Sequence, residues 1–313
     1  MGGCQGRAWK VAKALTPALE FTDLFKAIRG ESSVPCQQRS LGLSALTLGL
    51  FLGLSVSLAG CGSRLFFRPE SCARGSGLSP TLFRGTSLPD KHVSLTFMGG
   101  PGDESGSLAD FLFASNVRAT FFVTGENADS RKGILAVLRD RGHLVGNAGW
   151  SNRALNRQRD AVQSVRRVDW LITPYVTGNI FLLRAPEQAF DSQLAAVLNK
   201  GGLAKYTGPV GFDLGAVRAG NDVSDLRCLL LGTSPQACAG EILDATRLLA
   251  KGIIQLHDSL PGIVALVRTY VTTLQDEGWT FVPLDSVPDL RIAITANGGA
   301  PGAARTGGGC DDY

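Results

Sequence analysis

Apolar segments of strand length alternate with helical stretches along most of this chain, and this alternation constrains the fold more than any other feature. The helical stretches repeat apolar residues at i, i+3 and i+4, as in Leu108, Phe111 and Leu112. Several strand segments are continuously apolar, which is typical of parallel strands buried on both faces. The expected strands are residues 93–97, 118–124, 143–146, 179–184, 209–214, 252–257 and 280–284.

Repeated β-α units of this number predict an α/β domain, either a barrel or a doubly wound sheet. Gly142, Gly201 and Gly278 lie where the intervening helices should end. In both architectures, functional side chains gather at the carboxyl ends of the strands. The first such end reads TFMGGP and places Met98 and Gly99 at its tip.

An apolar run rich in small residues precedes the domain. It covers residues 41–58, follows Arg39 and leads into a small-residue site at Cys61, the layout of a secretory signal. The segment LAGC also resembles a bacterial lipobox, which implies cleavage before Cys61 and lipidation of that cysteine. A plain transmembrane anchor is the alternative, since the run approaches the ~20 apolar residues that span a bilayer. We expect an exported envelope lipoprotein anchored through Cys61, with the outer membrane preferred because residue 62 is not aspartate.

Composition sets the expected domain limits. Residues 1–60 form a signal peptide whose amino-terminal region is over-long, which permits a true start at Val34. Residues 61–90 carry the lipidated cysteine and a tether, residues 91–290 the domain, and residues 291–313 a flexible, glycine-rich tail. Beyond the signal, 25 Lys and Arg face 24 Asp and Glu, a balance that gives no electrostatic case for binding nucleic acid.

Cysteine usage agrees with export. Once Cys61 is lipidated, an even number remains, and disulfides form in oxidising compartments. Cys228 and Cys238 are close enough in sequence to close a loop, and Cys72 with Cys310 would tie the two ends of the domain together. Sequence alone does not fix the connectivity, and four free thiols are the alternative.

The order of five sequence blocks resembles the polysaccharide deacetylase family of the NodB-homology type. The blocks are LTFMGGP, RATFFVTGEN, RGHLVGNAGWSN, FLLRAP and KGIIQLHD, and they extend over residues 93–258. The resemblance implies a distorted (β/α) barrel that hydrolyses N- or O-acetyl groups of glycans with Zn²⁺ or another divalent metal. The implied partner is an acetylated glycan such as peptidoglycan, a chitin-like polymer or an exopolysaccharide.

The positions that would carry this chemistry hold other residues here. Met98 stands where the family has its general base, and Gly99, Ala148 and Asn152 stand where it has its metal ligands. Metal-assisted hydrolysis needs about three protein ligands and a base for the water's proton, which a thioether cannot supply. We therefore expect no metal cofactor and impaired metal-dependent hydrolysis of N-acetyl bonds. The nearest carboxylates, at positions 103 and 104, are displaced along the loop, and catalytic geometry tolerates little misplacement.

Two blocks keep the residues of the family pattern. Arg184 matches the arginine that holds the base carboxylate, and His257 matches the general acid that protonates the leaving amine. Asp213 is expected to tune His257, with Asp225 the less favoured choice, because residues 213–239 carry an insertion. A hydrogen-bonded strand-end histidine and a structural cation are the alternative roles of His257 and Arg184.

Further residues are expected beside the substrate. Trp150, Pro186 and Glu187 follow strand ends, although Glu187 is also typical of a solvent-exposed loop. If His257 has only a structural role, Asp258 beside it is expected to be exposed, and His143 is expected to pack within the domain.

Three functions fit these observations. The first is a deacetylase-fold lipoprotein that binds glycan or a partner without metal catalysis. The second is an active hydrolase with a non-standard site around His257, Arg184 and Asp213. The third is a non-catalytic structural or partner-binding envelope protein.

Overall fold

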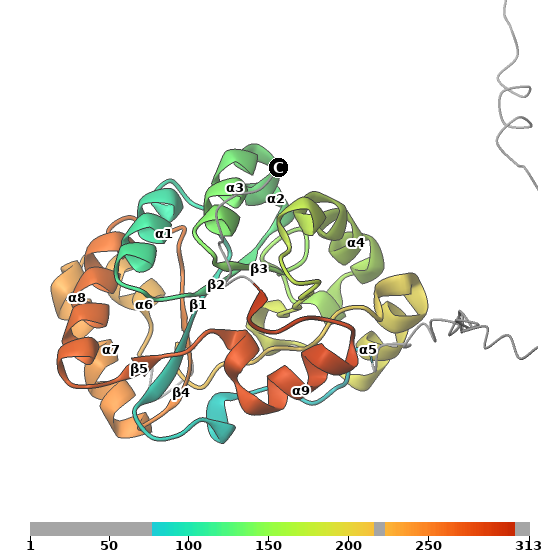
Figure 1. The fold of residues 1–313 in the computed structure, drawn as a ribbon. Coiled ribbons are helices and arrows are strands. Elements are labelled where there is room, and N and C mark those ends of the chain that lie inside the picture. Colours follow the sequence, from blue (N-terminus) through green and yellow to red (C-terminus); the bar gives the residue numbers. More distant parts are fainter. Residues whose placement is uncertain (1–76, 216–222, 304–313) are drawn as a thin grey trace, which may run out of the picture. The chain divides into compact units, whose positions relative to one another are not determined.

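The computed structural model describes residues 77–215 and 223–303 and contains one parallel sheet (Figure 1). Its strand order is β3-β2-β1-β4, with β5 pairing with the start of β1. Thr96 pairs with Thr120 on one side and with Gln255 on the other, so β1 is the central strand. The strands are β1 (His92–Met98), β2 (Thr120–Val123), β3 (Leu144–Asn147), β4 (Gly252–Leu256) and β5 (Thr280–Phe281).

Two further predicted strands close the sheet into a distorted barrel through single bridges. Residues 179–184 lie next to β3, and residues 209–214 connect them to β4. Neither segment is a continuous strand, and Pro209 has no N–H to donate to a ladder. The predicted (β/α) barrel is confirmed. The bridges that close it are Asn147–Leu183, Leu182–Thr207 and Leu214–Ile254.

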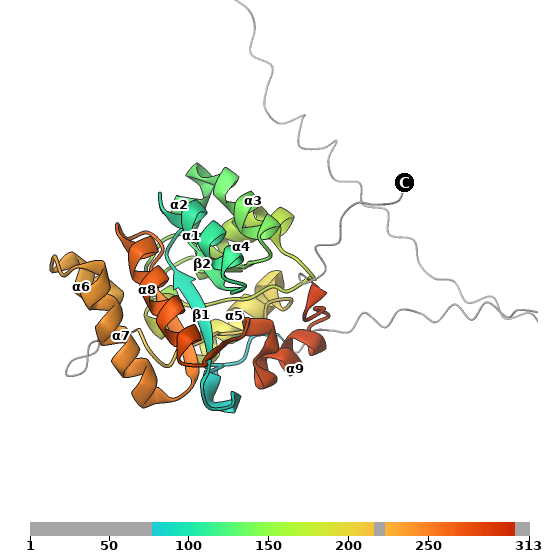
Figure 2. The same cartoon turned by 60° about the vertical axis from the view of Figure 1, so that its left-hand side comes forward.

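Helices surround this barrel (Figures 1 and 2). Both views place α6, α7 and α8 together on one side of the sheet, and α7 packs along both of its neighbours. The α-helices of the described residues are α1 (Ser105–Ala114), α2 (Gly125–Ser130), α3 (Lys132–Asp140), α4 (Ala161–Ile172), α5 (Ser192–Leu198), α6 (Asp225–Leu230), α7 (Pro235–Leu249), α8 (Ile263–Asp276) and α9 (Pro288–Ala296).

Alternate residues of β1 face two different apolar clusters, as the period of a strand requires. Leu95 and Phe97 pack against the surrounding helices in the main core. Met98 faces the other way and packs with Phe122 and Ala148 in a second cluster, which we call the interior cluster. The interior cluster takes residues from successive strands and fills the inside of the barrel.

The folded domain extends beyond both predicted limits. Leu78 and Leu88, in the predicted tether, are buried. Ile294, in the predicted tail, is buried in α9. These apolar side chains lie within segments that are rich in glycine, serine and proline, so composition alone concealed them. The predicted signal peptide, Cys61, Cys72 and Cys310 lie outside the described residues.

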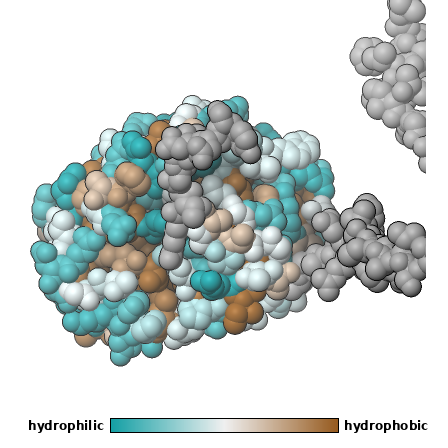
Figure 3. Space-filling model, in the orientation of Figure 1, coloured by the Kyte–Doolittle hydropathy of each residue, from teal (hydrophilic) through white to brown (hydrophobic). Residues whose placement is uncertain are grey.

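Cys228 and Cys238 form a disulfide with a Cα–Cα distance of 5.7 Å, as predicted. Within residues 77–215 and 223–303, no helix is long and apolar enough to cross a membrane. Figure 3 shows hydrophilic residues over most of the visible face, with hydrophobic ones in smaller areas between them.

Candidate functional site

The turn after β1 is shaped by backbone contacts. Gly99 donates its N–H to the carbonyl oxygen of Phe122 at 3.0 Å, and its own carbonyl accepts from Asn127 Nδ2 at 2.6 Å. Its φ of 87° lies in the left-handed region that favours glycine. The geometry of the turn therefore does not depend on an acidic side chain at its tip.

The predicted base position is apolar and buried. Met98 is 3% exposed and Ala148 is fully buried, and both belong to the interior cluster together with Phe122. Burying a methionine side chain stabilises the fold by roughly 1.5–3 kcal/mol. An ionised carboxylate at position 98 would have to be desolvated in these surroundings, so the residue present is suited to packing.

The carboxylates that follow this turn in sequence have other structural roles. Glu104 accepts hydrogen bonds from the N–H groups of Gly262 (2.8 Å) and Val264 (3.1 Å), at the start of α8. Asp103 is exposed and pairs with Arg131 at 2.9 Å. Both carboxylates are therefore engaged in contacts away from the base position.

The donor set does not fit a metal ion. Glycine and alanine offer no side-chain donor, Met98 is buried among apolar groups, and Asn152 is exposed to solvent. Within the part of the chain that the structure describes, no three His, Cys, Asp or Glu side chains form a group that could hold a metal. The chemistry of these side chains therefore argues against a bound metal at this site.

His257, at the end of β4, is paired with Asp225. The ring Nδ1 lies 2.9 Å from Asp225 Oδ1, and the backbone N–H of His257 donates to Oδ2. A carboxylate only accepts, so Nδ1 carries a proton and Nε2 is left to give or take one. Asp225 is fully buried and the His257 side chain is 13% exposed. The pair can therefore serve acid–base chemistry.

Asp213 was the favoured partner of His257, and that prediction is wrong. Asp213 Oδ2 accepts from the N–H groups of Gly85 and Ile253, both at 2.8 Å. Ile253 is the second residue of β4, and the chain rises about 13 Å from there to His257. Asp213 therefore links the segment at Gly85, which precedes β1, to the amino end of β4. The less favoured Asp225 contacts the histidine.

Arg184 lies inside the barrel. It donates from Nη1 to Thr96 Oγ1 at 2.8 Å, and from Nε and Nη2 to the carbonyl oxygens of Val210 (3.1 Å) and Gly211 (2.9 Å). Its guanidinium stacks on Phe122, 4.2 Å from the ring centroid. Burial lowers the pKa of Arg184 to about 9, and the charge of Asp213 opposes this shift. These contacts make Arg184 a brace between strand segments.

Asp258 is a site residue that sequence reasoning misplaced. It is 1% exposed, and its Oδ2 accepts from Ser105 Oγ at 2.6 Å. A Cβ atom at Gly100 would lie 2.0 Å from the same oxygen, so the glycine turn packs directly onto this carboxylate. Burial raises the pKa of Asp258 to about 6, and the hydrogen bond from Ser105 opposes the shift. Successive residues of a strand point to opposite faces. Asp258 follows His257 at the end of β4, so the sequence could have indicated that it faces away from the histidine, toward the β1 turn.

The predicted substrate-contacting residues differ in exposure. Trp150 is half-buried, with the Arg167 guanidinium 3.3 Å above its ring. Pro186 is buried, and Glu187 is exposed and lies 3.5 Å from Arg157. Contact with substrate therefore stays a prediction for these residues.

His143 packs within the domain, as predicted. It is fully buried and its Nδ1 accepts from the N–H of Ala119 at 3.2 Å, while Nε2 lies 3.0 Å from the carbonyl oxygen of Ala109. Burial lowers the pKa of His143 to about 4, so the ring is neutral near neutral pH. It belongs to the core and not to the site.

A cavity of about 840 Å³ lies elsewhere. Its lining includes Val117 and Gly142, which precede β2 and β3, and Thr280 of β5. It therefore opens toward the amino ends of the strands, whereas chemistry in barrels of this kind occurs at the carboxyl ends.

Comparison with known proteins agrees with this architecture. Residues 85–206 match the sequence model of the polysaccharide deacetylase family. The peptidoglycan-N-acetylglucosamine deacetylase PgdA of Listeria monocytogenes is 22% identical over 208 residues, which is 66% of this chain and 40% of that protein. The chitin deacetylase of Colletotrichum lindemuthianum is 32% identical over 114 residues, 32% of this chain and 43% of that protein. The chain thus spans less than half the length of these relatives.

A solved structure gives the same fold. The peptidoglycan deacetylase PdaC from Bacillus subtilis aligns with a TM-score of 0.51 at 20% identity, covering 66% of this chain and 94% of that one. The chain therefore contains a domain that matches the polysaccharide deacetylase family over residues 85–206 and has the fold of a solved deacetylase.

Proposed function

We propose that this domain binds acetylated glycans at the carboxyl end of its barrel without the metal-dependent hydrolysis of its family. The relatives are named for peptidoglycan and chitin, both polymers that carry N-acetyl groups. That chemistry defines the class of ligand proposed here.

One observation carries the proposal. Met98 and Ala148, at the positions of base and metal ligand, are buried in the apolar interior cluster. To restore metal-dependent hydrolysis, a carboxylate and imidazoles from other positions would have to replace the base and the metal ligands. The carboxylates next in sequence, Asp103 and Glu104, form contacts elsewhere. Hydrolysis by a metal-activated water therefore has neither a base nor ligands at these positions.

A second candidate function is hydrolysis without a metal. The His257–Asp225 pair favours it, because an oriented imidazole can protonate a leaving amine. This candidate function does not include Arg184 or Asp213. Arg184 is fully buried inside the barrel, and Asp213 lies at the amino end of β4, away from His257.

We further propose that the chain is an exported lipoprotein anchored through Cys61. The run at residues 41–58 and the LAGC segment support this, and the Cys228–Cys238 disulfide is consistent with an oxidising compartment. Metabolic labelling with an alkyne fatty acid tests it: the chain should take up label, and Cys61→Ser should abolish uptake. Labelling of the serine variant would contradict the proposal.

The functional test uses the purified full chain. Zinc content is measured after equilibration with Zn²⁺, binding of an N-acetylglucosamine oligomer by calorimetry, and acetate release from that oligomer and from peptidoglycan. We expect binding without stoichiometric zinc or acetate release. Metal-dependent release would overturn the proposal, release that is metal-independent and lost in His257→Ala would establish the second candidate, and failure to bind glycan would favour a structural or partner-binding role.

A variant with restored ligands sharpens the test. It carries Met98→Asp, Gly99→Asp, Ala148→His and Asn152→His. Space is available at position 99, where a Cβ would meet nothing within 4 Å, although the φ of 87° is strained for aspartate. Zinc uptake by this variant alone would show that the ligands, and not the architecture, differ from the family.

A further inference from the structure

Helix α6 is held to the domain by unusual side chains. It is six residues long, from Asp225 to Leu230, and isolated helices this short are unstable in water. Its buried residues are Asp225 and Cys228, whereas Leu230 is 70% exposed. A carboxylate and a disulfide, together with Leu229 packed against the main core, therefore fix its position.

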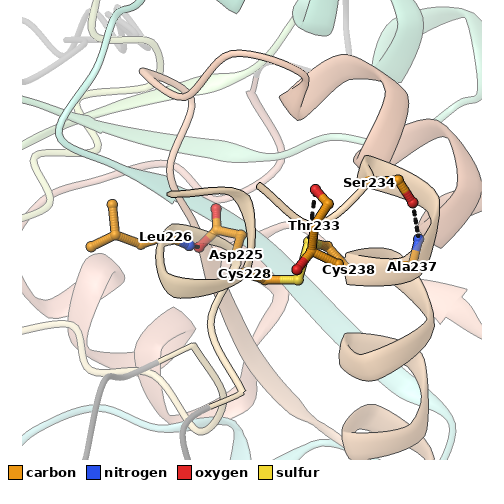
Figure 4. Close-up of a disulfide and its surroundings, with 7 residues drawn as sticks. All are labelled: Asp225, Leu226, Cys228, Thr233, Ser234, Ala237 and Cys238. Atoms are coloured by element: carbon orange, nitrogen blue, oxygen red, sulfur yellow. Dashed lines mark hydrogen bonds between the residues drawn. A yellow bond between two sulfur atoms is a disulfide. The ribbon is translucent and has the colours of Figure 1, made fainter. Parts of the chain in front are cut away.

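The two buried side chains lie on one face of α6. Asp225 and Cys228 are separated by three positions, so they are neighbours on the helix surface. Asp225 contacts His257 through both carboxylate oxygens, and Cys228 is bonded to Cys238. Figure 4 shows the carboxylate and the disulfide on the same short helix.

The partner helix α7 is firmly anchored. Cys238, Ala239, Ile242 and Leu243 are buried in the main core, and α7 packs along α8. Ser234 Oγ accepts from the N–H of Ala237 at 3.3 Å and caps its first turn. The disulfide therefore links the short helix to a fixed point of the fold.

The Asp225 carboxylate is stable in this position only while it keeps its hydrogen bonds. It is fully buried, and a buried charge is costly unless its hydrogen bonds are kept. If α6 could shift, the carboxylate would gain hydration and His257 would lose its partner.

We infer that the Cys228–Cys238 disulfide positions Asp225 against His257, so that the histidine–aspartate pair depends on oxidised cysteines. The relevance to function rests on the proposed role of the strand-end site, but the dependence itself is a property of the fold. Reduction by a dithiol breaks the S–S bond, adds two electrons and two protons to give two thiols, and oxidises the dithiol to its disulfide. Both sulfurs are buried, so this step requires opening of the α6–α7 loop.

Amide hydrogen exchange by NMR tests the inference without any glycan or activity. The readout is the backbone N–H of His257, which donates to Asp225, compared with that of Gln255, which donates to Leu214 within the barrel. In Cys228→Ala/Cys238→Ala, the His257 amide should exchange about 10- to 100-fold faster relative to the Gln255 amide, the loss expected for a hydrogen bond to a charged group. The Gln255 amide lies within the barrel, so any acceleration of its exchange measures the loss of global stability.

Two matched variants frame the result. Asp225→Asn keeps the disulfide and removes the charged acceptor, so it should accelerate the His257 amide similarly. Ser234→Ala removes the cap inside the same loop and keeps the disulfide, so the His257 amide should stay near its wild-type rate. If the double alanine variant fails to fold, Cys228→Ala/Cys238→Val fills the buried volume and carries the same expectation.

Two outcomes would overturn the inference. One is wild-type protection of the His257 amide in a folded variant without the disulfide. The other is equal acceleration of the His257 and Gln255 amides, which would mean that the disulfide stabilises the whole fold and does not position Asp225. Neither outcome depends on whether the domain binds or cleaves glycan.

Discussion

The ends of β1 and β4 lie side by side in the barrel but differ in chemistry. The β1 end carries Met98 in an apolar cluster and a turn shaped by its glycines. The β4 end carries His257 and Asp258, each in hydrogen bonds with buried partners. The β1 end therefore presents an apolar side chain, whereas the β4 end presents hydrogen-bonded polar groups.

This difference shows that the shape of the site and its chemistry have separate causes. Gly99 and Gly100 fix the turn through backbone hydrogen bonds and close contact with Asp258. None of these contacts involves the side chain at position 98. Polar groups at the β4 end support the fold as well, so their presence alone does not establish catalysis.

The largest expected effect tests whether Arg184 stabilises the barrel by connecting its strand segments. Arg184→Ala should lower the free energy of unfolding by about 3–5 kcal/mol, since it opens a cavity and leaves two carbonyl groups without donors. Urea denaturation measures the loss. Arg184→Met, which fills the volume, should lose less. If Arg184→Ala were as stable as wild type, a ligand-binding role would replace the structural one.

The next effect concerns pH and the buried carboxyl of the β4 end. The pKa of Asp258 is raised from 3.8 to about 6, so folding favours its protonated form and stability falls as pH rises from about 4 to 6. The pKa of His143 is lowered from 6.5 to about 4, so stability falls as pH drops through the same window. In the wild type these two dependences oppose each other.

Asp258→Asn should remove the pH dependence of stability that Asp258 causes, so that the dependence caused by His143 is no longer opposed. Its free energy of unfolding should fall, relative to the wild type, by about 3 kcal/mol more between pH 7 and pH 4. His143→Phe should show the opposite trend. Urea denaturation at several pH values measures both, and identical pH profiles for Asp258→Asn and the wild type would contradict a raised pKa for Asp258.

A smaller effect is expected from the disulfide beside the β4 end. Cys228→Ala/Cys238→Ala should lower the free energy of unfolding by about 2.5 kcal/mol, the entropy of closing a loop of this length. The sequence separation is 10 residues. Thermal denaturation of the variant beside the oxidised wild type measures this loss, and unchanged stability would show that α6 and α7 hold together without the bond.

The smallest effects separate the two carboxylates of the β1 turn. Glu104→Ala should cost about 1 kcal/mol, as the loss of a helix cap does, because it leaves the first N–H groups of α8 without an acceptor. Asp103→Ala should change stability by less than can be measured, because exposed ion pairs contribute little. Loss of a hydrolytic activity in Asp103→Ala would identify it as a displaced base.

Much of the fold follows from local pattern. The expected strands at 93–97, 118–124, 143–146, 252–257 and 280–284 all overlap observed strands. Residues 179–184 and 209–214 only make single bridges. Apolar periodicity detects a segment that lies against the core, but it does not report whether the neighbouring backbone offers continuous hydrogen bonds.

The candidate site was predictable where it depends on residue type. The Met98 thioether cannot act as a base, and Gly99 and Ala148 have no side-chain donor for a metal, whatever their surroundings. The partner of His257 was not predictable, because Asp225 and Asp213 are both carboxylates in a region of uncertain alignment. The choice between them depends on where α6 lies against β4.

By itself, the sequence determined the α/β architecture, the family resemblance and the missing donor groups, since these depend on apolar spacing, glycine and side-chain chemistry. Only the tertiary structure decided that Asp225 orients His257, that Asp258 is buried beneath the glycine turn and that Arg184 braces the barrel. Each of these depends on which groups meet across the closed barrel and on how much water they lose, and neither quantity is local to the chain.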